Sequence, residues 1–177
     1  MKWKVHLNSI EMLLLTHVHL DHVAGLPGIL TTMEANGRTT GLQIVCPVGA
    51  KERVISLMRE AQRLSFPVRV WELHDSATMD FGFCTVEAVG CKHSVPCNGY
   101  VIQVPRRPLL AIDRLTECQI PMENWTHIQA ENFYDAEAHS EFIRERRDGF
   151  KLVYVTDTVR TSRVVDAVRG GDLAVLE

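Results

Sequence analysis

Residues 16–22 read Thr16-His17-Val18-His19-Leu20-Asp21-His22 and directly follow an apolar run at residues 12–15. Imidazole nitrogens and carboxylate oxygens are the ligands that zinc and similar divalent ions prefer. His17 and His19 are two positions apart, so in extended chain they face the same side. Asp21 and His22 come after the predicted strand, where a turn offers a second set of ligands. The segment therefore predicts ligands for two adjacent metal ions.

The competing interpretation is that these are structural histidines at the end of a strand. A single histidine in such a place is usually a satisfied surface or core residue. Four polar groups this close together would be costly to bury without a partner. The density of the cluster therefore favours the metal site.

The composition is that of an ordinary globular protein: 177 residues, 46% hydrophobic, with a formal net charge of −3. This length predicts a single domain over residues 1–177. The charge balance excludes a globally basic nucleic-acid binder, so any such contact must come from local patches. No apolar run has the length of a membrane span, and residues 1–11 lack the apolar core of a secretory signal. Five cysteines without zinc-finger spacing predict reduced thiols in a cytoplasmic protein.

Apolar patterning predicts strands that alternate with helices. The predicted strands cover residues 10–16, 42–46, 68–73, 81–89, 100–104, 151–156 and 173–176, and the predicted helices cover residues 25–37, 50–64 and 162–169. Residues 105–150 have sparser apolar residues and denser charges, which predicts an insertion with short helices at 113–118 and 136–147. The alternation of strands and helices predicts a layered α/β fold.

Two later positions offer further ligands at the ends of predicted strands. His93 lies among small and turn-forming residues after the strand at 81–89, and Asp157 follows the strand at 151–156. Active sites in α/β sheets gather at the carboxyl ends of strands. Taken alone, His93 fits a structural histidine equally well, and Asp157 fits the N-cap of the next helix. Together with residues 16–22, both are predicted metal ligands.

These motifs together resemble the metallo-β-lactamase superfamily. The longer run at residues 13–30 and the sequence His-Ser-Val-Pro-Cys-Asn-Gly-Tyr at 93–100 look like its ribonuclease Z branch, the tRNA 3′ endonucleases. Ile-Pro-Met-Glu-Asn-Trp at 120–125, followed by Ile128-Gln129, resembles clostridial-type members. The resemblance runs over nearly the whole chain and implies an α/β fold, the αββα sandwich.

The resemblance implies a centre of two zinc ions, with Mn²⁺ or Mg²⁺ as other fitting metals. By matching positions, the first ion is held by His17, His19 and His93, the second by Asp21 and His22, and both by Asp157. The ions would activate a water and stabilise charge on the phosphate. Asp21 is also implied as a catalytic residue that handles the water's proton. Glu177 matches a catalytic glutamate that helps the leaving group take a proton, although Leu176 stands where the family has a histidine.

The family also has segments on both sides of this sequence, with strands before residue 1 and strands plus a last histidine ligand after residue 177. We therefore expect an incomplete sandwich, which lacks its first strands and its C-terminal part. We also expect a second zinc site that is short of one ligand, and a chain that is inactive as given. Two other functions remain open: a hydrolase of small phosphodiesters, lactones or thioesters, and an inactive metal-binding fragment.

The insertion at 105–150 stands where the family carries its exosite, an arm that grips tRNA. Basic residues there are candidates for phosphate contacts: Arg106, Arg107, Arg144, Arg146 and Arg147. Acidic residues interleave with them, so a solvated charged face explains the pattern equally well. The resemblance implies precursor tRNA as the partner, a homodimer in which one subunit's arm serves the other, and a cytoplasmic location.

Overall fold

The computed structural model describes residues 6–61 and 63–177. The chain divides into two compact units, one built from residues 1–102 and 151–177 and the other from residues 103–150. The second unit spans nearly the range of the expected insertion.

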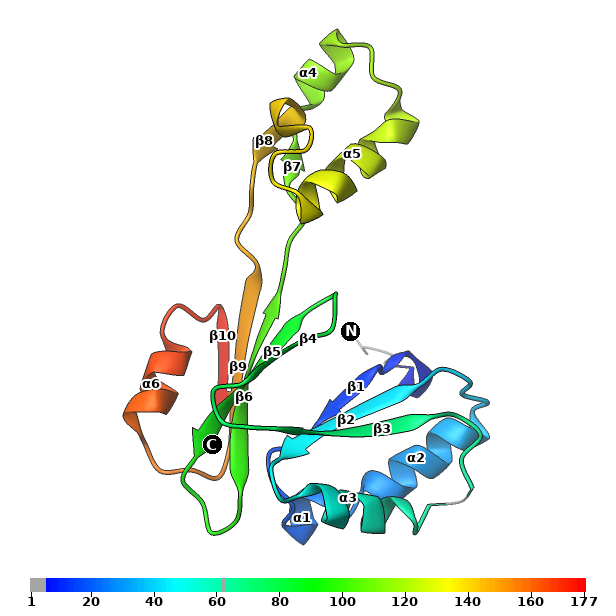
Figure 1. Cartoon of the computed structure of the whole chain (residues 1–177), viewed down its shortest axis with the longest axis vertical. Coiled ribbons are helices and arrows are strands. Elements are labelled where there is room, and N and C mark those ends of the chain that lie inside the picture. Colours follow the sequence, from blue (N-terminus) through cyan, green and yellow to red (C-terminus); the bar gives the residue numbers. More distant parts are fainter. Residues whose placement is uncertain (1–5, 62) are drawn as a thin grey trace, which may run out of the picture. The chain divides into compact units, whose positions relative to one another are not determined.

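The first unit contains a three-stranded parallel sheet (Figure 1). In sheet order its strands are β1 (Met12–Leu14), β2 (Leu42–Pro47) and β3 (Val68–Leu73). Parallel neighbours require crossover connections, which here are helical. The helices are α1 (Leu20–Val23) and α2 (Leu26–Ala35) between β1 and β2, and α3 (Lys51–Met58) between β2 and β3; the 3₁₀ helix η1 (Leu7–Ser9) precedes β1. The carboxyl ends of all three strands therefore lie at one edge of this sheet.

The second sheet of the first unit is mixed. In sheet order its strands are β10 (Leu173–Leu176), β9 (Phe150–Val155), β6 (Cys97–Val104), β5 (Thr85–Cys91) and β4 (Thr78–Asp80). β4 and β5 form an antiparallel pair. β9 and β10 are parallel, and α6 (Ser162–Val168) connects them.

Three layers of apolar side chains hold these elements together. Along β2, Ile44 packs in the cluster beneath α2 and α3, whereas its neighbour Val45 packs in the cluster between the two sheets. Along β6, Tyr100 belongs to the cluster between the sheets and Val101 packs with Val164 of α6. This is the period-two alternation of strands that are buried on both faces. The order helix, sheet, sheet, helix confirms the predicted layered α/β fold.

The second unit is a short antiparallel strand pair that carries two helices. In chain order it contains β7 (Leu109–Leu110), α4 (Ile112–Glu117), α5 (Met122–Tyr134), the 3₁₀ helix η2 (Ser140–Phe142) and β8 (Ile143–Glu145). Leu115 and Ile128 are buried in it. Asn132 is buried as well, and its Nδ2 donates to the carbonyl oxygens of Ala136 and Ala138 at 3.0 and 2.7 Å.

The structure corrects several predicted elements. Residues 136–147 are not a helix, because the Asn132 side chain binds two carbonyls of this segment and the chain continues as η2 and β8. The strand predicted at 81–89 begins only at Thr85, because Gly82, with a φ of +81°, turns the chain back from β4. The helix predicted at 50–64 ends at Met58, and the predicted first strand is shorter than residues 10–16.

The other predicted strands and helices of the first unit are confirmed, with small differences at their ends. In the second unit the helix at 113–118 is confirmed as α4, whereas α5 is absent from the prediction because its apolar residues are sparse. Across residues 6–61 and 63–177, no helix is both long enough and apolar enough to cross a membrane.

Candidate metal centre

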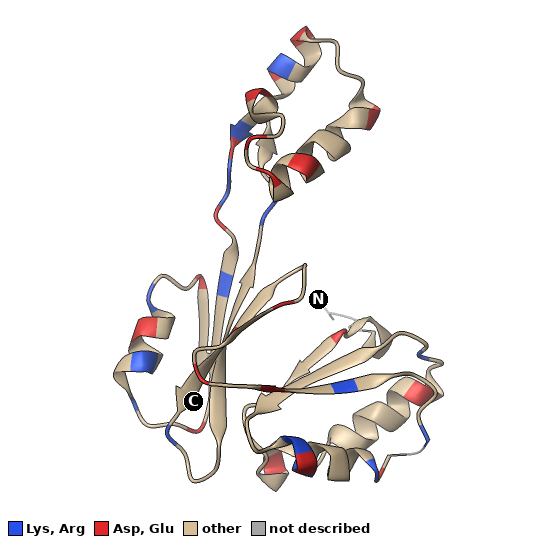
Figure 2. Ribbon diagram, in the orientation of Figure 1, with Lys and Arg blue, Asp and Glu red and all other residues tan. Residues whose placement is uncertain are grey.

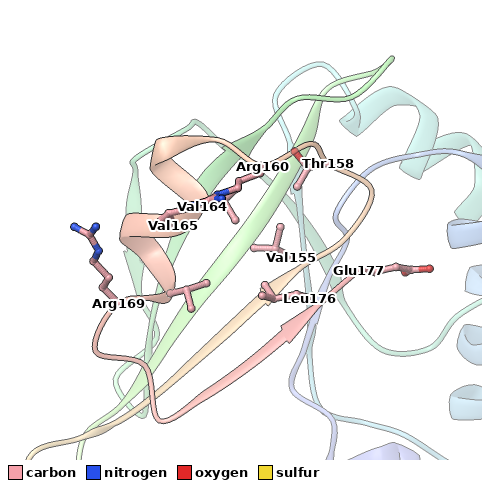
Figure 3. Close-up of a pocket in the computed structure, with 9 residues that line it drawn as sticks. Val155, Thr158, Arg160, Val164, Val165, Arg169, Leu176 and Glu177 are labelled. Carbon is pink, nitrogen blue, oxygen red and sulfur yellow. The ribbon is translucent and has the colours of Figure 1, made fainter.

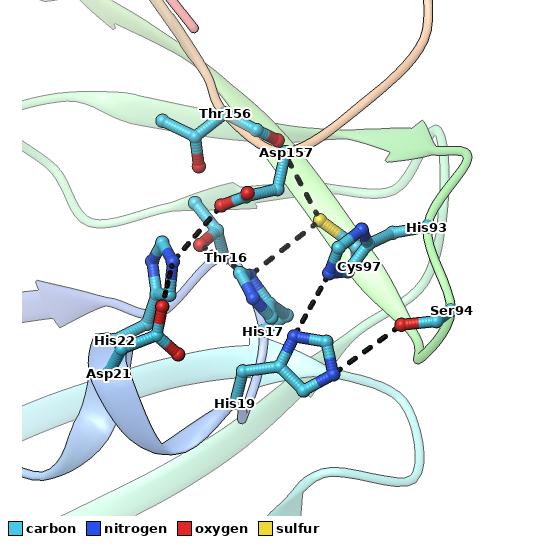
Figure 4. Close-up of polar contacts among 10 residues, drawn as sticks. All are labelled: Thr16, His17, His19, Asp21, His22, His93, Ser94, Cys97, Thr156 and Asp157. Atoms are coloured by element: carbon cyan, nitrogen blue, oxygen red, sulfur yellow. Dashed lines mark hydrogen bonds and ion pairs between the residues drawn. The ribbon is translucent and has the colours of Figure 1, made fainter.

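The predicted ligands lie on the loop that leaves β1. The N–H of Leu15 donates to the carbonyl of Val45 at 2.8 Å, and the chain then bends away from β2. Thr16 and His17 are buried at this bend. His19 has extended backbone angles and precedes α1, a single helical turn that carries Asp21 and His22. Figure 4 shows these side chains converging with His93 and Asp157.

Three imidazoles form the first group, which we call the three-histidine group: His17, His19 and His93. Their candidate ligand nitrogens lie within 4.8 Å of one another. His93 comes from the connection between β5 and β6, and its Nε2 is 3.0 Å from Nδ1 of His19. The Oγ of Ser94 is 3.4 Å from the other nitrogen of His19, Nε2. Three imidazole nitrogens directed at one region match the ligand chemistry of zinc.

A second group, which we call the mixed group, consists of His17, His22 and Asp157. Nε2 of His22 lies 3.1 Å from Oδ2 of Asp157 and 3.5 Å from Oδ2 of Asp21. The Asp21 side chain is 79% exposed and belongs to neither group. The structure thus brings five of the predicted ligands together and leaves Asp21 beside His22 at the rim.

Asp157 follows β9 with a φ of +50°, a left-handed conformation that Asp adopts more readily than most residues. The alternative that Asp157 caps the next helix is wrong. Thr161 is the N-cap of α6, and its side chain accepts a hydrogen bond from the N–H of Val164 at 3.2 Å. Asp157 instead directs its carboxylate toward His22 (Figure 4).

His17 is the buried member of both groups. Its Nδ1 lies 3.1 Å from Oγ1 of Thr16, whereas its Nε2 is buried and has no hydrogen-bond partner among the described residues. Burial lowers the pKa of His17, and the neighbouring His22 and His93 lower it further, so the ring is neutral near pH 7. Oδ2 of Asp157 is also buried without a hydrogen bond of good geometry, despite its closeness to His22. An unpartnered imidazole nitrogen beside an unpartnered carboxylate oxygen fits a divalent cation.

The start of β6 supports this centre, a role that sequence reasoning missed. The N–H of Asn98 donates to the carbonyl of Thr16 at 2.9 Å, and the hydroxyl of Tyr100 donates to the carbonyl of Leu15 at 2.6 Å. Both residues are buried. The run at 93–100 carries a family resemblance, but its contacts with residues 15–17 exist only in the folded chain.

Comparison with known proteins identifies the family. Residues 2–110 match a family described as "Beta-lactamase superfamily domain". The chain belongs to the β-lactamase superfamily. A relative from Agathobacter rectalis, named ribonuclease Z, is 32% identical over 178 residues, which cover 98% of this chain and 59% of that protein. This superfamily member spans about 59% of the length of the curated relatives that it matches.

Solved structures share the fold of this β-lactamase superfamily chain. Human tRNase Z, short form, has a TM-score of 0.58 at 18% identity, over 97% of this chain and 58% of that one. The metallo-β-lactamase fold protein YhfI of Bacillus subtilis has a TM-score of 0.56 at 13% identity, over 96% of this chain and 50% of that one. The predicted metallo-β-lactamase fold is therefore confirmed.

The five cysteines of this superfamily member are free thiols. The thiol of Cys91 donates to the carbonyl of Val89 at 3.4 Å, and the neighbouring Cys97 lowers the pKa of Cys91 to about 7 against the opposing effect of burial. Away from the centre, burial raises the pKa of Cys46 to about 11. No disulfide therefore constrains the five residues that converge as candidate ligands.

Glu177 is outside both groups of candidate ligands in this β-lactamase superfamily chain. Its N–H donates to the carbonyl of Val155 at 3.1 Å. Its exposed side chain borders an apolar groove between α6 and β10, which Val164 and Leu176 also line (Figure 3). The catalytic role of Glu177 stays a prediction.

The arginines predicted to bind RNA all belong to the second unit of the superfamily chain. Nε and Nη2 of Arg147 donate to the carbonyl of Arg107 at 3.0 and 2.8 Å. Nη1 of Arg146 donates to Oδ1 of Asn132 at 3.2 Å. Arg146 and Arg147 thus have internal structural contacts, although both residues are exposed.

Arg144 and Arg106 are held less firmly. The guanidinium of Arg106 lies 5.9 Å from the ring centroid of Phe150. Arg144 is exposed on β8, and within residues 103–150 its side chain makes no hydrogen bond or ion pair. Figure 2 shows basic and acidic positions interleaved along this part of the chain. The geometry is compatible with phosphate contacts and with a solvated charged face.

Proposed function

We propose that this chain is the metal-binding part of a ribonuclease that removes the 3′ trailer of precursor tRNA. The observation that carries this proposal is the convergence of the three-histidine group and the mixed group around the buried His17. The relative named ribonuclease Z and the solved tRNase Z support the substrate class.

The three-histidine group would hold a first zinc ion, because it offers three imidazole nitrogens and His17 has no other partner for Nε2. His22 and Asp157 would hold a second ion, and Asp21 would add a further oxygen; the family resemblance implies that Asp157 is also a ligand of the first ion. When bound, two such ions supply Lewis acidity toward water and phosphate oxygens at neutral pH. Mn²⁺ or Mg²⁺ would suit the second site better than the first, because the ligands of the second site include carboxylates.

His17 belongs to both groups, and because Thr16 occupies its Nδ1, both groups would use Nε2 of His17. If Nε2 of His17 binds the first ion, the second keeps only His22, Asp157 and the exposed Asp21. We therefore expect a tight first site and a weak second site.

The carboxylates divide the proton chemistry between them. Asp21 would take the proton of the attacking water, because its side chain is open to solvent and lies 3.5 Å from Nε2 of His22. Asp157 is held inward by its backbone conformation and by His22, so it would orient ligands and leave proton transfer to Asp21. Glu177 would return a proton to the leaving oxygen, a role that rests on the family resemblance.

Precursor tRNA would contact the chain through its phosphates. Because the net charge is −3, these contacts must be local. Arg144 has an exposed guanidinium without internal partners in its unit and would make the main contact. The other arginines, Arg106, Arg107, Arg146 and Arg147, would add to the basic surface. A homodimer and a cytoplasmic location remain predictions.

Metal stoichiometry tests the centre directly. We expect the purified chain, equilibrated with zinc and analysed by elemental mass spectrometry, to retain one tightly held ion and a second at higher zinc concentration. His93→Ala should abolish tight binding. His127→Ala is the matched control, because that side chain is 71% exposed on α5 of the second unit. Equal zinc retention by all three proteins would contradict the proposed centre.

A substrate panel tests the reaction class. The zinc-loaded chain is assayed with a precursor tRNA that carries a 3′ trailer, with bis(p-nitrophenyl) phosphate and with a lactone. Zinc-dependent trailer release that Asp157→Ala abolishes would support the ribonuclease. Hydrolysis of the small substrates alone would favour a general metallo-hydrolase. Tight zinc binding without any hydrolysis would leave a metal-binding fragment.

A further inference from the structure

Four consecutive residues at the start of β6 each meet a segment that carries candidate ligands. The thiol of Cys97 lies 4.0 Å from Nδ1 of His17. The N–H of Asn98 donates to the carbonyl of Thr16. A Cβ on Gly99 would lie 2.6 Å from Cγ2 of Val155, so only glycine permits this approach to β9. The hydroxyl of Tyr100 completes the series by donating to Leu15.

Tyr100 makes the contact that a single substitution can remove most cleanly. Its side chain is fully buried, with 0% exposure, and its Oη lies 2.6 Å from the carbonyl oxygen of Leu15. Burial raises the pKa of this phenol, so it remains a hydrogen-bond donor at neutral pH. The N–H of Leu15 is bound to Val45 on the other side. Both backbone groups of Leu15 are therefore held, two positions before His17.

A second bond holds the next residue and ties it to the first sheet. Asn98 binds the carbonyl of Thr16 through its N–H and the carbonyl of Leu73, at the end of β3, through Nδ2 at 2.9 Å. The carbonyls of residues 15 and 16 are thus both held by residues of β6, directly before the segment that carries His17 and His19. Figure 4 shows Thr16 beside His17, with His19 on the same segment. Such a support reduces the freedom that the ligands must lose when they bind an ion.

We propose that Tyr100 is a positioning residue for the metal centre: its hydroxyl fixes the Leu15 carbonyl and, with it, the backbone from which His17 and His19 project. This inference rests on the proposed metal centre. Tyr100 contacts neither the ion nor the substrate in this role, so it acts only through the ligands. The competing view is that the hydroxyl stabilises the fold without affecting the ligands.

The test compares Tyr100→Phe with Tyr154→Phe in the full chain. Both variants lose one hydroxyl, but Tyr154 is 40% exposed on β9. Zinc affinity is measured by competition with a chromophoric chelator, and ligand geometry by the visible absorption of the cobalt-substituted protein. We expect Tyr100→Phe to weaken zinc binding roughly tenfold, which is the size typical of losing an outer-shell partner. We also expect it to change the cobalt spectrum. Tyr154→Phe should leave both unchanged.

The outcomes separate this inference from the proposal beneath it. A wild-type chain that binds no zinc would overturn both. Tight zinc binding by the wild type, with the same affinity and cobalt spectrum in Tyr100→Phe, would overturn the inference alone, even if that variant unfolds more easily. If Tyr100→Phe is not folded under standard conditions, the comparison is made for all three proteins in trimethylamine N-oxide, an osmolyte that favours the folded state.

Discussion

Oγ1 of Thr16 lies 3.1 Å from Nδ1 of His17, and both side chains are buried. The hydroxyl can accept a hydrogen bond from Nδ1 or donate one to it, so the direction of this contact follows the tautomer of the ring. When Nδ1 donates to the hydroxyl, Nε2 keeps a free lone pair for a metal ion. Thr16 belongs to neither ligand group but contacts His17, the one imidazole that both groups share.

The first prediction is that Thr16→Val weakens zinc binding about tenfold. Valine has nearly the shape of threonine but offers no oxygen, so the tautomer with a proton on Nε2 gains population. Nitrogen-15 NMR of the histidine rings in the zinc-free protein reports the tautomer, and chelator competition reports the affinity. Thr16→Ser should restore both. Unchanged tautomer populations in Thr16→Val would argue against this account.

The second prediction concerns the close approach of β6 and β9. Gly99→Ala places a Cβ 2.6 Å from Cγ2 of Val155, so we expect a loss of roughly 2 kcal/mol in the free energy of unfolding. Urea titration measures it. Gly99→Ala combined with Val155→Ala should cost less than the sum of the single changes. Gly28→Ala is the control, because its Cβ would meet nothing within 4 Å and alanine favours the helix there.

The third prediction concerns the buried Arg38. Its guanidinium donates to the carbonyls of Asn8, Thr40 and Gly41 at 3.2, 2.8 and 2.7 Å, and only 2% of the residue is exposed. Arg38→Ala leaves three carbonyls without a donor, which we expect to cost about 3 kcal/mol. Arg53→Ala, at an exposed position of α3, should cost less than about 0.5 kcal/mol. Similar urea midpoints for the two variants would refute the expectation.

The fourth prediction is a loss of stability in alkali. The pKa of Cys46 is about 11 in the folded chain and 9.0 in the reference state, so the unfolded chain loses this proton first. The stabilisation that the protonated Cys46 thiol gives the folded chain is fully present below pH 9 and falls as the pH rises toward 11. At pH 10 about 1 kcal/mol of this stabilisation is lost. The free energy of unfolding of Cys46→Ala should therefore fall less between pH 8 and pH 10 than that of the wild type.

The fifth prediction depends on the proposed RNA substrate. Arg144→Gln should reduce the slope of log affinity against log salt by roughly 1, because one phosphate contact is lost. Arg53→Gln makes the same change of charge in the first unit and should leave the slope unchanged. Affinity for a precursor tRNA is measured across a salt series. Equal slopes for all three proteins would identify Arg144 as part of a solvated charged face.

The sequence predicts that the candidate ligands converge because these residues follow strands whose apolar pattern is clear. Residues 17–22 stand after β1, and His93 and Asp157 stand after β5 and β9. β1 belongs to one sheet and β5 and β9 to the other, and residues that follow these strands converge at the candidate centre. The chemistry of imidazole and carboxylate supplies the rest of the inference.

The errors occur where tertiary contacts override local pattern. Residues 136–147 have the charge spacing of a helix, but the buried amide of Asn132 binds the carbonyls that a helix would use. The roles of Thr16 and Tyr100 depend on atoms distant in sequence, and one sequence contains no signal for such pairs. That Asp21 binds a metal stays a prediction: its carboxylate lies 3.5 Å from Nε2 of His22 but is 79% exposed.

The candidate ligands come from residues 17–22, 93 and 157, and these positions span most of the first unit. An ion bound there would cross-link these positions and close two long loops of the chain at once. The last strand to carry a ligand is β9, so tight binding requires that almost the whole unit has assembled. Removal of metal by a chelator should then accelerate unfolding as well as empty the site, and metal retention would serve as a gauge of complete folding.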